Sequence, residues 1–224
     1  MSCPSLDLRV RIGDPKCPSG RAPEPVVEAV KQATTAVLDL GLKPLMLGGE
    51  HSISSGAVAA VAERYPDLVL LQLDAHADLR ESWLGGRHSH ACAMRRCLEV
   101  LPSGELLQLA IRSGTKEEFQ ELRREQRLVG LQQLAARLQA IQGRPLYLTV
   151  DLDWFDPSVM PGTGTPEPGG YLWPDFAELT ALLQGQNLVA ADVVELAPGL
   201  DASGCSSVLA AKVVRSLLLS LAAP

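Results

Sequence analysis

The chain has 224 residues, of which 46% are hydrophobic and 21% are charged, a composition typical of one globular domain. Its formal net charge of -6 and the lack of a Lys/Arg-rich run argue against nucleic-acid binding. The five cysteines are scattered without a CxxC pair, and the N-terminus lacks the basic and apolar regions of a signal peptide. We therefore expect a cytoplasmic protein with reduced thiols and a single domain over residues 1–224.

Short apolar runs bounded by glycine, proline or aspartate predict buried strands at residues 44–49, 68–74, 105–111, 146–153 and 188–196. Helical spacing of apolar residues occurs between these runs, at residues 26–40, 57–65, 92–101, 131–141 and 176–183. The apolar C-terminal segment is interrupted by Lys212 and Arg215, so we expect a helix packed on the core and no membrane span. This alternation predicts an α/β fold, a doubly wound and mainly parallel sheet with helices on both faces.

Three of the predicted strands end in clusters of side chains that can bind metal. The clusters contain, in chain order, Glu50 and His51, then Asp74, His76 and Asp78, then Asp151, Asp153 and Asp156. Ligands of a doubly wound sheet bind beyond the carboxyl ends of its strands, and residues two apart in an extended or just-turning chain project the same way. We therefore expect these side chains to converge.

Burying so many carboxylates together is costly unless cations neutralise them. A set of imidazoles and carboxylates favours Mn(II), with Zn, Co, Ni or Fe also possible. Six ligands exceed what one open site needs, so some carboxylates should bridge two ions ~3.5 to 4 Å apart. Each cluster alone has an ordinary structural explanation, such as a turn or a helix cap. Three clusters at three strand ends favour a binuclear metal site.

Five segments resemble the ureohydrolase family of arginases, agmatinases and formiminoglutamases: GGEHS, DAHAD, DLDWFDP, PGTGTPEPGG and DVVELAP. The segments HSHACAMRR and IRSGTKEEF are most similar to agmatinases, which convert agmatine to putrescine and urea in polyamine metabolism. The resemblance implies an arginase-like three-layer fold, two Mn(II) ions per chain and a small guanidino substrate. It also implies a homo-oligomer, a trimer or a hexamer.

The resemblance gives each of the six metal-capable residues a position around the two ions. It implies two bridging carboxylates and two terminal ligands for each ion: Asp74 and Asp151 bridge, His51 and Asp78 bind one ion, and His76 and Asp153 bind the other.

The resemblance also assigns three residues to the substrate. Glu195 matches the glutamate that holds the guanidinium, and a carboxylate suits the fork of NH groups on that cation. His90 matches the proton-shuttling histidine, which could protonate the departing amine. His88 competes with His90 for this role, and Thr165 matches a threonine beside the substrate.

Family chains usually begin with a further strand and helix before the segment that matches residues 7–14. We therefore expect an N-terminally shortened domain, in which the strand before His51 is unpaired at one edge or pairs with residues 8–12. Glu50 stands where the family commonly has aspartate, and Ala91 where it has glycine. A formiminoglutamate-type hydrolase and a non-catalytic homologue acting as a partner subunit remain as alternatives. A dinucleotide-binding protein is disfavoured because no GxGxxG follows a strand.

Overall fold

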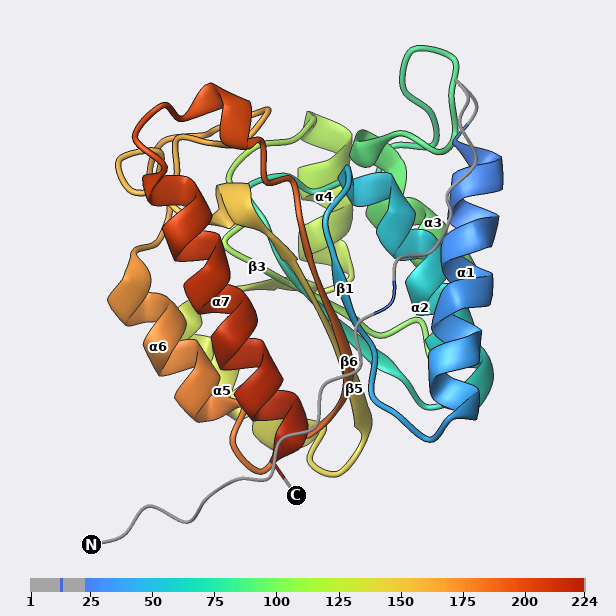
Figure 1. Cartoon of the computed structure of the whole chain (residues 1–224). Helices are drawn as coiled ribbons and strands as arrows, with labels where there is room; N and C mark the ends of the chain where they lie inside the picture. Colours follow the sequence, from blue (N-terminus) through green and yellow to red (C-terminus); the bar gives the residue numbers. More distant parts are fainter. Residues whose placement is uncertain (1–12, 14–22, 224) are drawn as a thin grey trace, which may run out of the picture.

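The structure is a computed structural model, and it describes residue 13 and residues 23–223. Strands and helices alternate through this part of the chain (Figure 1). The α-helices of this part are α1 Glu24–Asp39, α2 Ser54–Arg64, α3 Ala93–Val100, α4 Lys116–Arg124, α5 Leu131–Ala140, α6 Trp173–Leu182 and α7 Cys205–Ala222. The strands are β1 Leu45–Leu47, β2 Val69–Leu73, β3 Leu106–Leu109, β4 Leu128–Val129, β5 Pro145–Asp151 and β6 Asn187–Val194. Short 3-10 helices follow several strands: η1 His51–Ile53, η2 His90–Cys92, η3 Leu152–Trp154 and η4 Pro198–Leu200.

The strands of the described residues form one six-stranded sheet in the order β1-β6-β5-β2-β3-β4, and every adjacent pair is parallel. Helices cover both faces: α1 to α4 contribute to one hydrophobic cluster and α5 to α7 to the other. Figure 1 shows α1, α2 and α3 on one side of the sheet and α5, α6 and α7 on the opposite side. The predicted doubly wound fold is confirmed.

The direction of chain winding changes between β2 and β5, which are neighbours in the sheet. From β2 the chain continues outward to β3 and β4, and from β5 it continues the other way to β6. Such a switch point leaves a crevice at the carboxyl ends of the two central strands, where the flanking loops part to opposite faces. The fold therefore places any bound ligand next to the residues that follow β2 and β5.

The central strands are apolar because both of their faces are buried. Leu71 and Leu73 of β2 pack in the cluster with α5 to α7, whereas Leu70 packs in the cluster with α1 to α4. All residues of β2 and β3 are buried. The near-continuous apolar runs in the sequence are thus explained by a sheet that lies inside two helical layers.

Three features at the margins of the sheet bear on the sequence predictions. Strand β1 lies at one edge of the described sheet and pairs with β6. The suggested pairing with residues 8–12 lies outside the described residues. Helix α4 and the two-residue strand β4 were not predicted; α4 begins with a capping box between Thr115 and Glu118 and buries Leu122.

Helix α7 is the one helix of the described residues that is long and apolar enough to cross a membrane, with a mean hydropathy of 1.5 over 18 residues. It instead packs on the sheet, where Val213 and Leu217 are fully buried in the cluster that α5 and α6 share. The helix contacts both β6 and α6. This arrangement agrees with the predicted helix packed on the core.

Candidate metal centre

The predicted metal ligands gather at the switch point of the sheet. Asp74 comes directly after β2, and Asp151 is the last residue of the neighbouring strand β5. His51 begins η1 after β1, and Asp153 lies in η3, one short turn beyond β5. The structure thus brings together side chains from three separate strand ends, as the sequence predicts.

The first group of ligands surrounds the imidazole of His51. Its Nδ1 atom lies 3.1 Å from Asp74 Oδ2, 3.1 Å from Asp78 Oδ2 and 3.3 Å from Asp151 Oδ2. His51 is completely buried, and within the described chain its Nδ1 atom makes no hydrogen bond of good geometry. A buried ring nitrogen that faces three carboxylate oxygens is a donor set suited to a divalent cation.

The second group shares a carboxylate with the first. His76 Nδ1 lies 3.0 Å from Asp153 Oδ2 and 3.5 Å from Asp74 Oδ1. Asp74 therefore directs one oxygen to the His51 group and the other to the His76 group, and both groups could hold a metal ion. Asp151 differs, because its Oδ1 atom accepts a hydrogen bond from Asp153 N at 2.9 Å and only Oδ2 faces His51.

The charge balance of the cluster also fits cations. Burial and the neighbouring Asp74 carboxylate raise the pKa of Asp78 to about 7. Burial and the carboxylates of Asp153 and Asp74 also raise the pKa of Asp151. Partial burial opposes the charge on His76, yet pairing with Asp153 and Asp74 raises its pKa to about 11. More negative charge is buried here than the imidazoles offset, and divalent cations would supply the remainder.

Two site residues have a backbone conformation that non-glycine residues rarely adopt. Asp78 has φ of 54° and Glu195 has φ of 63°, both in the left-handed region. Such a conformation costs of order 1 to 3 kcal/mol and persists where the surroundings enforce it. For Glu195 the enforcing contacts are hydrogen bonds from its own N to Gly49 O and from His51 N to its Oε1 atom. The bend turns the Glu195 side chain back toward the ligand cluster.

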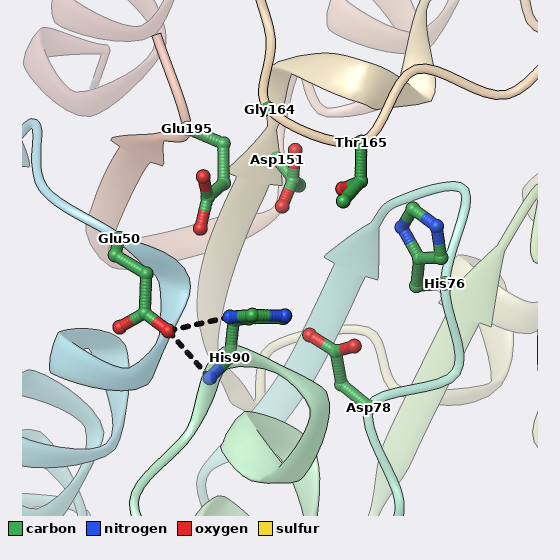
Figure 2. A pocket seen from close by; sticks show the side chains of 8 residues that line it. All are labelled: Glu50, His76, Asp78, His90, Asp151, Gly164, Thr165 and Glu195. Atoms are coloured by element: carbon green, nitrogen blue, oxygen red, sulfur yellow. Dashed lines mark hydrogen bonds and ion pairs between the residues drawn. The ribbon is translucent and has the colours of Figure 1, made fainter. Parts of the chain in front are cut away.

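A cavity of about 260 Å³ opens beside the metal-capable groups. Its lining residues are Glu50, His76, Asp78, His90, Asp151, Gly164, Thr165 and Glu195, which Figure 2 shows around one space. The three residues assigned to the substrate by resemblance are all among them. His88, the competitor for the shuttle role, does not line this cavity in the described chain.

His90 is held at the cavity by Glu50 (Figure 2). Glu50 Oε1 accepts a hydrogen bond from His90 N at 2.5 Å and lies 2.9 Å from His90 Nδ1. The hydrogen bond to Glu50 and the charge of this carboxylate raise the pKa of His90 above its ordinary value. Burial raises the pKa of Glu195. The cavity therefore has an imidazole with a raised pKa and, held by His51 N, the carboxylate of Glu195.

Sequence reasoning missed a residue that holds the loop beyond Asp153. Arg112, which follows β3, donates hydrogen bonds to the backbone oxygens of Asp153 at 2.7 Å, Glu167 at 2.8 Å and Pro168 at 3.1 Å. The guanidinium thereby ties the loop that carries Thr165 to the turn that carries Asp153. The IRSG segment contained the arginine, but its spacing from these carbonyl groups is not readable in the sequence.

Comparisons with known proteins identify a family that matches this chain. A model of the arginase family matches residues 5–220. The chain is 37% identical to an agmatinase of Bacillus anthracis over 217 residues, covering 92% of this chain and 73% of that protein. It is 32% identical to a guanidinobutyrase of Pseudomonas aeruginosa, covering 87% of this chain and 66% of that protein. A crystal structure of an agmatinase candidate from Clostridium difficile matches with a TM-score of 0.90 and 36% identity, covering 98% of this chain and 84% of that one.

Proposed function

The chain belongs to the arginase family and is a ureohydrolase, a hydrolase of carbon–nitrogen bonds in linear amidines, and we propose that it converts agmatine to putrescine and urea with two Mn(II) ions. The observation that carries this proposal is the carboxylate of Asp74, which offers one oxygen to each of two His/Asp groups. The cavity lined by Glu195 and His90 lies directly beside these groups.

Six side chains would hold the two ions. His51, Asp78 and Asp151 would hold one ion, His76 and Asp153 the other, and Asp74 would serve both. The family resemblance adds Asp151 as a second shared carboxylate. Bound divalent ions would polarise water for attack at neutral pH and offset charge that develops on the substrate. Mn(II) suits this mixture of carboxylates and imidazoles, and Ni, Co, Zn and Fe are the competing ions.

The charges around the cavity favour a cationic substrate. Glu50 and Glu195 line it in addition to the metal-capable carboxylates, and no lysine or arginine is among its lining residues in the described chain. Agmatine has a guanidinium at one end and an ammonium at the other, so both ends are attracted to this field. A carboxylate tail, as in 4-guanidinobutyrate or arginine, meets repulsion instead.

Glu195 would bind and orient the guanidinium. Its Oε1 atom already accepts a hydrogen bond from His51 N at 2.7 Å, which fixes the carboxylate and leaves Oε2 to accept from the substrate. A carboxylate fixed in this way holds the planar cation in one orientation beside the ligand cluster. Thr165, whose Oγ1 lies 3.3 Å from Asp153 Oδ2, would limit the space on the opposite side.

His90 would deliver the proton that the departing amine needs. Glu50 contacts the Nδ1 atom of His90, which leaves Nε2 available to the cavity. Glu50 raises the pKa of His90. At neutral pH a larger fraction of His90 side chains than of isolated histidine side chains therefore carries the proton that can be transferred. Glu50 thus acts through His90, as a positioning residue.

Urea release tests the proposal. Mn(II)-loaded protein is assayed with agmatine, arginine, 4-guanidinobutyrate, 3-guanidinopropionate and guanidine, and we expect agmatine to give the highest kcat/KM. No urea from any of the five compounds would refute the reading as an amidinohydrolase. Formamide release from formiminoglutamate would support the formiminoglutamate-type alternative, which the comparisons with agmatinases and a guanidinobutyrase do not favour.

The alternative of a non-catalytic partner subunit is not favoured, because all six predicted ligands are present and both Glu195 and His90 line the cavity. Element analysis of the purified protein separates these readings, since a non-catalytic homologue would not need a divalent pair. The homo-oligomer, trimer or hexamer, and the cytoplasmic location remain predictions. Light scattering on the purified protein tests the first of these.

A further inference from the structure

Four buried polar residues lie side by side across the sheet, just below the ends of the strands that carry the ligands. We call them the polar row: Gln108 of β3, Gln72 of β2, Thr149 of β5 and Asp192 of β6. The strand register pairs Gln108 with Gln72, Gln72 with Thr149, and Thr149 with Asp192. We propose that the polar row is a positioning layer that orients His51 and Asp74 for metal binding.

The polar row faces one helical layer only. Side chains two residues apart on a strand share a face. The residues two positions before members of the row, Leu70, Leu106, Tyr147 and Ala190, all pack in the cluster with α1 to α4. His51 begins η1, which leads directly into α2 of that same layer. The row therefore lies beneath the imidazole of His51, between the sheet and the helices.

One half of the polar row fixes the tautomer of His51. The hydroxyl of Thr149 donates its single proton to Asp192 Oδ1 at 2.6 Å. The hydroxyl oxygen of Thr149 lies 3.0 Å from His51 Nε2, and because its proton is given to Asp192, it accepts a hydrogen bond from that nitrogen. The neutral imidazole then carries its proton on Nε2 and directs the lone pair of Nδ1 toward the three ligand carboxylates.

The other half of the polar row fixes Asp74. Gln72 Nε2 donates to Asp74 Oδ2 at 2.6 Å and to His76 O at 3.2 Å. Gln108 Nε2 in turn donates to Gln72 Oε1 at 2.5 Å and to Ala77 O at 2.8 Å. The two amides thus support the carboxylate that both metal-capable groups share, together with the turn that leads from Asp74 to Asp78.

The chemistry of the polar row does not suit a purely structural role. All four side chains are completely buried, and the core of a parallel sheet is normally filled by valine, leucine and isoleucine. Asp192 is balanced by the hydroxyl groups of Thr149 and Tyr147, a weaker compensation for a buried carboxylate than an ion pair. Apolar side chains of similar volume would stabilise the sheet at lower cost. Polar groups at this depth are explained by the two ligands that they contact.

The test removes the link to His51 while keeping the shape of the side chain. Thr149→Val deletes the hydroxyl, and Thr149→Ser keeps it. We expect Thr149→Val to weaken the binding of Mn(II) at the His51 group roughly 10- to 100-fold, measured by isothermal titration calorimetry, and Thr149→Ser to retain affinity. Tyr147→Phe is the matched control: it removes a hydroxyl from the same Asp192 carboxylate without touching His51, so its loss should be smaller.

A second variant tests the other half of the polar row. Gln72→Leu removes the amide that holds Asp74, and because both metal-capable groups share this carboxylate, we expect weaker binding of both ions. Electron paramagnetic resonance of the Mn(II)-loaded protein should then show loss of the signal of a spin-coupled pair. A merely structural role would lower the melting temperature of the metal-free protein without changing metal affinity, and that result overturns the inference.

The inference rests on the proposed ligand roles, and the outcomes separate the two. If the unsubstituted protein binds no divalent ions, both the proposed function and the inference fail. If it binds two ions and releases urea, but Thr149→Val and Gln72→Leu bind Mn(II) as tightly as it does, only the inference fails.

Discussion

Replacing Glu195 by glutamine tests the substrate-binding role of this residue with a change of one atom. Glu195 Oε1 accepts a hydrogen bond from His51 N at 2.7 Å. Glutamine has a single acceptor oxygen, and if that oxygen keeps the bond to His51 N, its NH2 group faces the substrate. A donor then meets the NH groups of the guanidinium, where the native protein offers a charged acceptor.

The expected loss follows from this geometry. A hydrogen bond to a charged group contributes about 1.5 to 3 kcal/mol. Since about 1.4 kcal/mol corresponds to a tenfold change in rate, Glu195→Gln should lower kcat/KM for agmatine about 10- to 150-fold. The metal content should not change, because neither of the metal-capable groups contains Glu195.

The assay compares urea release by Glu195→Gln with that of a matched control, Glu167→Gln. Glu167 is a carboxylate near the site, with Oε1 3.8 Å from His76 Nε2, but it does not line the cavity of the described chain. We expect the control to retain activity. A Glu195→Gln protein with normal metal content and unchanged kcat/KM would refute the proposed role of Glu195.

Three further predictions concern the metal groups and the core. Asp74→Asn should lose both ions and Asp78→Asn mainly the ion at His51; equal losses by element analysis would contradict the sharing of Asp74. Dialysis against a chelator should lower the melting temperature, and added Mn(II) should restore it, because ions that bind the folded state stabilise it; scanning fluorimetry showing no shift would argue against the site. Trp154 is fully buried, and its ring is stacked on that of Tyr171 with 4.8 Å between the ring centroids. Trp154→Ala should therefore lower the free energy of unfolding, measured with urea, by about 3 to 5 kcal/mol. Trp173→Ala, at a partly exposed position, is the control, and a loss for Trp154→Ala that exceeds that of the control by less than about 1 kcal/mol would contradict this packing.

The fold was readable from the sequence because buried parallel strands leave a simple pattern. Five apolar runs match β1, β2, β3, β5 and β6 within a few residues. Parallel strands end at one edge of a sheet, so polar residues after several such runs had to meet there. This argument was enough to predict that the three clusters containing His51, Asp74 and Asp151 lie close together.

The route by which the ligands converge was not readable. The sequence argument took the chain through Asp74, His76 and Asp78 as extended or just turning and expected all three side chains to project the same way, whereas β2 ends at Leu73. His76 N donates to Asp74 Oδ1 at 2.6 Å, and Asp78 has a left-handed backbone. A turn therefore sends Asp78 to the His51 group and His76 to the other, a division that strand alternation does not predict.

Helix α4 escaped the hydrophobic pattern because it is almost entirely polar. Glu118 and Leu122 are its buried residues. The signal present in the sequence was the capping box, in which Thr115 accepts from Glu118 N and Glu118 accepts from Thr115 N. Glu118 also accepts from Leu79 N, which anchors the segment that follows Asp78. Helix α4 thus contacts the site through the buried carboxylate of Glu118, a residue type that hydrophobic periodicity assigns to the exposed face of a helix.

The polar row has a consequence for how the strands find one another during folding. A slip of one strand by two residues keeps every side chain on its original face of the sheet, so the alternation of faces does not exclude it. A slip of β5 by two residues would place Tyr147 or Asp151 beside Gln72 and remove Thr149 from Asp192. Each buried group left unpaired costs about 1 to 3 kcal/mol. The side chains that orient the ligands therefore also penalise misaligned sheets, and the correct alignment alone completes the site.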